Sequence, residues 1–188
     1  STYPYAVQRP GPAWKSNLAP LVPQGVVCHS AVGYVNGLHD VLGAPFIRSS
    51  WHFSILYDGT VEQHYDTTFQ CWHAQAANAF AVGIEHEGGF DPEDEPLTRE
   101  QLEASVTLVR WLAAEHGFEL VRHGDGRTLF EHNEFYPKPC PSGRIPWDEY
   151  PLPSEVVAID LTPFGEDEDE VDVRPLDQGE TIAALESV

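Results

Sequence analysis

The residues best suited to chemistry are concentrated in one short stretch, His132 to Cys140, which reads HNEFYPKPC. It combines an imidazole, the ammonium group of Lys138 and a thiol. Three prolines between positions 137 and 141 alternate with Lys138 and Cys140. Because each proline fixes its own φ and extends the residue before it, these two side chains stand on a stiff loop or sheet edge. The stretch therefore suits a metal site with a lysine close by. Its alternative interpretation is a proline-rich turn with a buried cysteine.

Further candidate functional residues lie in three segments upstream of this stretch. His29 lies near the end of the apolar run QGVVCHSA, Trp51 opens a second run, and His73 precedes the carboxylate of Glu85. Strand ends, and loops held on a rigid sheet, are where binding groups usually gather. These segments and the HNEFYPKPC stretch are therefore the parts of one candidate site.

A catalytic zinc ion takes three protein ligands and leaves a fourth position open for water. His29, His132 and Cys140 would supply these ligands, and a single thiolate would leave the site positive enough to lower the pKa of bound water. His123 competes with His132, but the extended HNEFYPKPC spacing favours His132. Any one of the nine histidines could equally be a structural residue with satisfied ring nitrogens. The remaining two cysteines, Cys28 and Cys71, are interpreted as small buried hydrophobes.

The elements that must position these residues indicate an α/β fold. The Asp58-Gly59 pair between two apolar runs predicts a hairpin, because glycine adopts the positive φ of a tight turn. In the run 81–87, Glu85 and Glu87 alternate with His86 and so share one face of a strand. Further strands are expected at 24–31, 51–57, 60–65 and 118–121, and a short helix at 35–42.

The clearest predicted helix begins after Thr98. Thr98 is a suitable N-cap, Gln101 stands at the capping-box position, and Gly117 is a natural residue to end the helix. An apolar stripe recurs at helical spacing, at Leu102, Val106, Val109 and Ala113. We expect this helix to be structural.

The composition limits the functions that this chain can serve. Its 188 residues suffice for one domain with extensions. Thirty acidic residues against ten basic ones give a net charge of −20, which offers no footprint for nucleic acid. The same charge should repel anionic membranes and wall polymers unless another domain supplies binding. No apolar run could span a membrane and no signal peptide is visible, while the absence of methionine suggests a processed or excised fragment.

Four motifs in this order and spacing resemble one enzyme family. They read VVCHSA, SWHFSILYDGTVEQHYD, CWHAQAANAFAVGIEHEG and EHNEFYPKPCPSG, and they cover roughly Gly25 to Trp147. They are similar to the zinc-dependent type 2 N-acetylmuramoyl-L-alanine amidases, a family that includes short phage lysozyme-amidases and animal peptidoglycan recognition proteins. The resemblance implies a single α/β domain with a central mixed β-sheet flanked by helices. It also implies hydrolysis of the amide between N-acetylmuramic acid and L-alanine in peptidoglycan.

The resemblance assigns roles residue by residue. His29, His132 and Cys140 take the positions of the zinc ligands, and the cysteine matches the phage and recognition-protein branch, where other members have aspartate. Lys138 takes the position of the catalytic lysine, and Glu85 that of the glutamate that some bacterial amidases use as general acid and base. Substrate-binding residues are expected at Trp51, His73 and Asn78.

One position departs from the phage branch, which has a catalytic tyrosine directly before the His-Phe pair. Trp51 stands there instead, and because an indole does not shuttle protons at ordinary pH, the acid–base role shifts to Glu85. Lys138 would stabilise the developing oxyanion. The alternative function is a recognition module that binds peptidoglycan without cutting it, although such proteins typically lose the cysteine that Cys140 provides. A structural zinc domain would want four protein ligands and no nearby lysine.

The expected organisation is a proline-rich arm at 1–23, a catalytic domain at 24–151 and an acidic tail or linker at 152–188. We expect a monomer whose partner is peptidoglycan or a muropeptide, with no nucleic acid and no membrane. The implied place of action is the bacterial cell wall. The protein would reach it by release from a host cytoplasm, if it is a phage or prophage endolysin, or by secretion; the cysteine ligand and the missing signal favour the endolysin.

Overall fold

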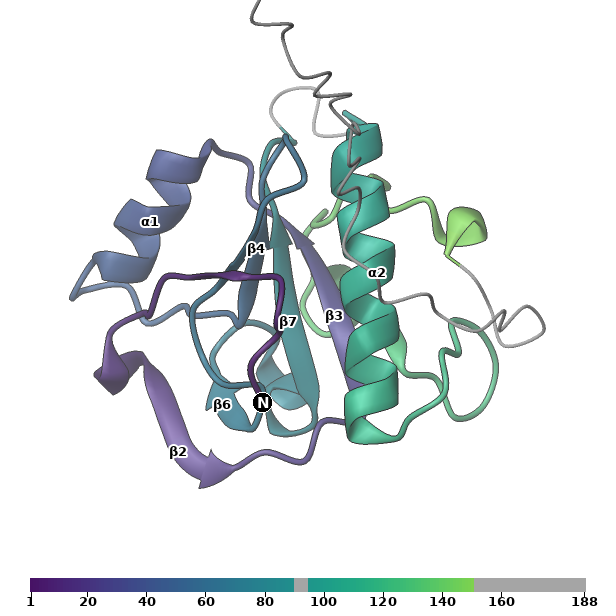
Figure 1. The fold of residues 1–188 in the computed structure, drawn as a ribbon, viewed down its shortest axis with the longest axis horizontal. Helices are drawn as coiled ribbons and strands as arrows, with labels where there is room; N and C mark the ends of the chain where they lie inside the picture. Colours follow the sequence, from purple (N-terminus) through teal and green to yellow (C-terminus); the bar gives the residue numbers. More distant parts are fainter. Residues whose placement is uncertain (90–94, 151–188) are drawn as a thin grey trace, which may run out of the picture. The chain divides into compact units, whose positions relative to one another are not determined.

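A mixed β-sheet carries the functional elements of the chain (Figure 1). The computed structural model describes residues 1–89 and 95–150, and its six-stranded sheet has the order β1-β5-β4-β7-β3-β8. Neighbouring strands run parallel except for β4 and β5, the antiparallel hairpin that turns at Asp58-Gly59 as predicted. The strands are β1 (Val7–Gln8), β3 (Gly25–Ser30), β4 (Phe53–Ile55), β5 (Val61–Gln63), β7 (Ala81–His86) and β8 (Leu129–Glu131). The predicted α/β fold with a central mixed sheet is confirmed.

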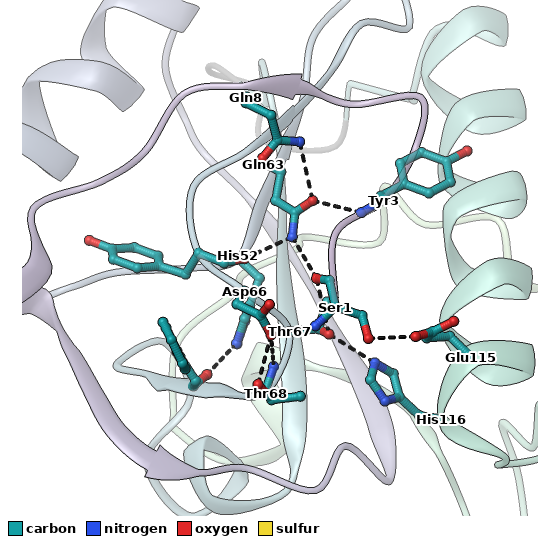
Figure 2. A network of polar contacts seen from close by, with 12 residues as sticks. Ser1, Tyr3, Gln8, His52, Gln63, Asp66, Thr67, Thr68, Glu115 and His116 are labelled. Carbon is teal, nitrogen blue, oxygen red and sulfur yellow. Dashed lines mark hydrogen bonds and ion pairs between the residues drawn. The ribbon is translucent and has the colours of Figure 1, made fainter.

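The first 23 residues are paired with the rest of the domain. In addition to β1, they contribute β2 (Ser16–Pro20), which forms a small antiparallel sheet with β6 (Phe69–Cys71). Figure 2 shows the polar contacts at the start of the chain, where the backbone N–H of Tyr3 donates to Oε1 of Gln63 at 2.8 Å. The Tyr3 ring is only 4% exposed and belongs to the main hydrophobic core. The segment expected to be an arm thus forms part of the packed structure.

Helix α2 (Arg99–His116) covers one face of the sheet (Figure 1). The predicted capping box is present, because the Thr98 hydroxyl accepts from Gln101 N and the Gln101 side chain accepts from Thr98 N. The predicted apolar stripe faces the core: Val109 and Ala113 are buried, and Leu102 and Val106 are half-buried and pack against it. The buried face consists of Gln101, Ser105, Leu108, Val109, Leu112 and Ala113. Its two polar members are buried because the sheet satisfies them, as Ser105 Oγ bonds His86 Nε2 at 2.8 Å.

The shorter helix, α1 (Val35–Gly43), packs on a separate apolar cluster. Its buried residues Leu38 and Leu42 contact Trp51 and Tyr65. The helix agrees with the prediction for 35–42. The 3₁₀ helices are η1 (Ala13–Lys15), η2 (Gln75–Ala79), η3 (His132–Glu134) and η4 (Trp147–Glu149). Within the described ranges, no helix combines the length and apolarity needed to cross a membrane.

The strand predicted at 118–121 is wrong. This segment is irregular, and the strand that follows α2 is β8, at Leu129–Glu131. The carbonyl of Val121 accepts from the N–H groups of both Thr128 and Leu129, at 2.8 and 3.1 Å. The apolar residues after Gly117 therefore close a loop back onto β8 instead of forming a ladder of their own.

The two faces of the sheet carry different side chains. Val26, Cys28 and Ile84 pack with α2 in the main core, whereas the alternating residues His29 and Glu85 point away from it. The parallel register pairs His29 directly with Glu85, which places both side chains on the same face. Cys28 is fully buried, as predicted. The predicted acidic tail, 152–188, lies outside the described residues.

Candidate active site

Two histidines and a cysteine from distant parts of the chain meet at the end of β3. The potential ligand atoms of His29, His132 and Cys140 all lie within 4.8 Å of one another, and the two Nδ1 atoms are 3.0 Å apart. His123, the competing candidate, is exposed on the loop before β8. The structure therefore brings together the three residues that the sequence analysis selected as ligands.

The parallel pairing of β3 with β8 explains this convergence. Cys28 is paired with Glu131, so His132 enters the site directly after the last strand residue. The HNEFYPKPC stretch then turns back on itself, because Asn133 N–H donates to the carbonyl oxygen of Cys140 at 2.9 Å. Ser30 N–H, at the end of β3, donates to Cys140 Sγ at 3.2 Å. Two backbone contacts, one at its carbonyl oxygen and one at its thiol, thus hold Cys140 beside the histidines.

A chain of hydrogen bonds determines which nitrogen of His29 is available. A carbonyl oxygen only accepts, so the contact between His73 Nε2 and Ala81 O at 3.2 Å requires the proton on His73 Nε2. His73 Nδ1 then accepts from His29 Nε2 at 3.1 Å, which leaves the lone pair of His29 on Nδ1, towards His132. Gly83 permits this arrangement, because a Cβ there would lie 2.6 Å from the His73 ring.

The protonation states of the cluster suit a cation. Burial holds the pKa of His29 well below its usual range, and burial together with Lys138 lowers the pKa of His132 to about 4. Both rings are therefore neutral donors of a lone pair at neutral pH. Burial, followed by the neighbouring Glu85, raises the pKa of Cys140 to about 12. A thiolate at this position would thus need a bound cation, whose binding would release the proton.

Glu85 is the carboxyl group that faces this cluster. Its Oε1 atom lies 3.9 Å from His29 Nδ1, and its side chain is 15% exposed. Within residues 1–89 and 95–150, its buried Oε2 atom has no hydrogen-bond partner. Burial raises the pKa of Glu85 to about 7, against the opposing effect of Lys138. A carboxyl with this pKa and an unused oxygen can both take up and release a proton near neutral pH.

A cavity of about 420 Å³ opens over the cluster. Lys138 and Trp51 line it, together with His73 and Glu85. Lys138 is exposed, with its ammonium nitrogen 5.6 Å from the centre of the Tyr136 ring. This ring and the rigid proline loop hold the positive charge at the mouth of the cavity.

The other residues expected to bind substrate differ in their placement. The Trp51 indole is 3% exposed and donates its N–H to Ser54 Oγ at 2.8 Å, so it forms a fixed wall of the cavity. Asn78 lies below the loop that carries His73, where its Oδ1 accepts from the backbone N–H groups of His73 and Ala74, at 2.9 and 2.7 Å. Asn78 thus stabilises the loop that carries His73.

One residue near the site had no role in the sequence analysis. Arg144 is 2% exposed and donates from Nη1 to Ser30 Oγ at 2.8 Å and from Nη2 to the Glu87 carbonyl at 3.1 Å. Arg144 thus braces Ser30, the residue that donates to Cys140. The Glu87 carboxylate accepts from Val35 N at 2.7 Å and so satisfies an N–H group at the start of α1. An arginine four residues after Cys140 was the available signal, but a sequence does not show burial.

A cavity that holds two neutral histidines, a cysteine and a buried carboxyl group is typical of metal-dependent hydrolases. The sequence profile of the N-acetylmuramoyl-L-alanine amidases matches residues 19–143, and the chain belongs to this family. The recognised resemblance and the fold that it implied are therefore confirmed.

Two phage proteins illustrate the similarity in sequence. The endolysin of Escherichia phage T7 is 33% identical over 95 residues, and that of Klebsiella phage KP32 is 32% identical over the same length. Each match covers 49% of this chain and 58% of the phage protein, so the chain spans less than two thirds of these relatives.

Solved structures agree with the fold. The endolysin N-acetylmuramoyl-L-alanine amidase LysCS from Clostridium intestinale superposes with a TM-score of 0.62 at 25% identity, over 80% of this chain and 95% of that one. The Drosophila peptidoglycan recognition protein SD superposes with a TM-score of 0.55 at 17% identity, over 73% and 84%. At this identity, the second match concerns the fold alone.

Proposed function

We propose that this chain hydrolyses the amide bond between N-acetylmuramic acid and L-alanine in peptidoglycan, as a zinc-dependent amidase. The observation that carries the proposal is the meeting of His29, His132 and Cys140 with Glu85 in one cavity. The family match over residues 19–143 supports the same reaction.

The donor set fits zinc. Zn²⁺ accepts imidazole nitrogen and thiolate sulfur together, and three protein ligands leave one coordination position for water or substrate. His29, His132 and Cys140 would hold the ion, and the unpartnered Oε2 of Glu85 stands beside them. When bound, zinc would supply Lewis-acid polarisation of the scissile carbonyl and a lowered pKa for an attacking water.

The protein's own residues transfer the proton of the attacking water and stabilise the negative charge of the intermediate. Glu85 accepts the proton of the attacking water and later delivers it to the leaving amine of L-alanine, which its pKa of about 7 permits. Lys138 offers a fixed positive charge for the oxygen that becomes negative in the tetrahedral intermediate. Trp51 and His73 line the cavity in which the muramyl peptide lies.

The same proposal covers the setting of the reaction. The substrate partner is peptidoglycan, the protein acts as a monomer on the bacterial cell wall, and the endolysin relatives favour a phage or prophage origin. The proposed catalytic domain is residues 24–151; the segment 1–23, which packs with it, precedes it in the sequence, and the acidic segment 152–188 follows it in the sequence.

A zinc titration joined to a hydrolysis assay tests the proposal. The purified protein should bind one equivalent of zinc, release L-alanyl peptide from a soluble muramyl peptide, and lose this activity with a chelator. Cys140→Ser should remove both binding and turnover, whereas the matched exposed variant His123→Ala should keep both. Zinc binding without any turnover would instead favour the non-catalytic recognition module.

A further inference from the structure

A second cavity, of about 720 Å³, lies apart from the proposed reaction centre. Trp14, Lys15, Asn17, Arg48 and Trp72 line most of it. The ladder between β2 and β6 pairs Ser16 with Cys71, and this pairing brings the residues just before β2 next to those just after β6. Nothing in the proposed reaction uses this cavity.

The frame of the cavity is rigid. Ser50 is fully buried and its hydroxyl donates to the carbonyl oxygen of Lys15 at 2.6 Å. The same hydroxyl accepts from Trp72 N at 2.9 Å, and Ser50 N donates to Trp72 O at 3.1 Å. One serine therefore links the three segments that form the cavity. The cavity is preorganised, so that little conformational entropy is lost when a ligand binds.

The lining has the chemistry of a carbohydrate site. The Trp14 and Trp72 side chains are 57% and 38% exposed, so both indoles can contact a ligand in this cavity. Pyranose rings present C–H groups on their flat faces, and these pack on aromatic rings. Asn17 and Arg48 border the same space with groups that can bond sugar hydroxyls and N-acetyl carbonyls.

The charge of the cavity points to an acidic sugar. In a chain with ten basic residues and a net charge of −20, two cations line this one cavity. The Lys15 ammonium is buried and bonded to the Val41 carbonyl at 2.7 Å, and the Arg48 side chain is exposed. Cations so placed favour carboxylates, and each N-acetylmuramic acid freed of its peptide carries one, on its lactyl group.

The second cavity also adjoins the first along the chain. Ser49 and His73 line the reaction cavity, and their immediate neighbours Arg48 and Trp72 line the second one. The two cavities are therefore built on the same two segments of the chain. We propose that the second cavity binds the glycan strand of peptidoglycan, as amino-sugar rings that carry lactyl carboxylates. This inference rests on the proposed function for its choice of polymer, but the binding itself requires neither zinc nor turnover.

A binding experiment tests the inference without catalysis. The full chain is titrated with peptide-free glycan strands, made of alternating N-acetylglucosamine and N-acetylmuramic acid, while the indole N–H signals of its five tryptophans are followed by NMR. The Trp14 and Trp72 signals should move together, and Trp14→Ala should weaken binding by about 3- to 10-fold. Neutral chitotetraose should bind more weakly than the acidic strand. Equal binding of the two sugars, or unmoved Trp14 and Trp72 signals, would overturn the inference.

A turnover experiment separates this inference from the proposed function. Trp14→Ala and Arg48→Ala should each lower the ratio of kcat/KM on polymeric peptidoglycan to kcat/KM on a single-sugar muramyl peptide by about 3- to 10-fold. Tyr5→Ala and Arg99→Ala, which alter exposed residues outside the cavity, should leave the ratio unchanged. Hydrolysis with an unchanged ratio in the cavity variants would refute the glycan site alone. Absence of hydrolysis on both substrates, with strand binding intact, would refute the amidase proposal and retain the site.

Discussion

His73 Nδ1 accepts a hydrogen bond from the Nε2–H group of His29, with the two nitrogens 3.1 Å apart. Because His73 in turn donates to the Ala81 carbonyl, the direction of both hydrogen bonds follows from the backbone of β7. The consequence is a neutral His29 whose Nδ1 lone pair faces His132 and Cys140. A residue outside the ligand set thus determines which tautomer the ligand adopts.

Removing this acceptor should weaken metal binding. His73→Ala leaves His29 free to rotate and to change tautomer, so zinc affinity should fall by about 10- to 100-fold. His73→Asn, whose amide oxygen can take the place of Nδ1, should recover part of the loss. Competition with a chromophoric chelator measures both affinities, and equal affinities for the alanine variant and the parent protein would contradict the relay.

Substitution of Glu85 should separate proton transfer from metal binding. Glu85→Gln keeps the shape of the side chain but not its proton chemistry, so kcat should fall by about 10²- to 10⁴-fold while zinc content stays the same. Trp51→Phe should cost far less, since the indole N–H already bonds Ser54 Oγ. Lys138→Ala should lower kcat by about 10²- to 10³-fold, as loss of one oxyanion partner does. Turnover of a defined muramyl peptide measures all three, and near-normal kcat in Glu85→Gln would mean that another group moves the proton.

Loss of the buried Arg144 guanidinium should destabilise the folded protein. Arg144→Met leaves Ser30 Oγ and the carbonyl oxygens of Glu87 and Glu95 without their charged donor, which should lower the free energy of unfolding by about 1.5–3 kcal/mol. The matched control is Arg99→Met, because Arg99 is 84% exposed and pairs only with Glu103 among the described residues. Its effect should stay within about 0.5 kcal/mol. Urea denaturation compares the two variants, and similar midpoints would show that Arg144 is not a brace.

Acid should destabilise the fold through buried neutral histidines. His52 donates to the Phe69 carbonyl and accepts from Gly83 N, and burial lowers its pKa to about 4. Between its unfolded pKa near 6.5 and about 4, the unfolded chain binds more protons than the folded one, so stability falls as the pH falls. This histidine alone should contribute about 1.4 kcal/mol per pH unit in that window.

The variant His52→Gln isolates this contribution. It removes the titrating ring but can keep one polar contact, so it should be less stable at pH 7 and lose less stability between pH 6.5 and 4.5. Unfolding free energies at several pH values in a chelator, which removes the effect of zinc release, give the two slopes. Parallel slopes for parent and variant would assign the acid sensitivity to other groups.

The sequence alone determined the features that depend on neighbours along the chain. The capping box of Thr98 and Gln101, the Asp58-Gly59 turn and the alternation of Glu85 with His86 follow from interactions within a few residues, which the local sequence favours. The order of the four motifs also identified the family from the sequence alone, because the members of a family share such motifs.

Only the tertiary structure decided the features that depend on distant partners. Ser105 is buried in α2 because His86 receives its hydroxyl, and the segment 118–121 is no strand because Val121 bonds the start of β8. The acceptor role of His73 and the burial of Arg144 likewise depend on groups at least 8 and 49 residues away, respectively. Such contacts form when the sheet assembles, so the pattern of residues along one segment does not contain them.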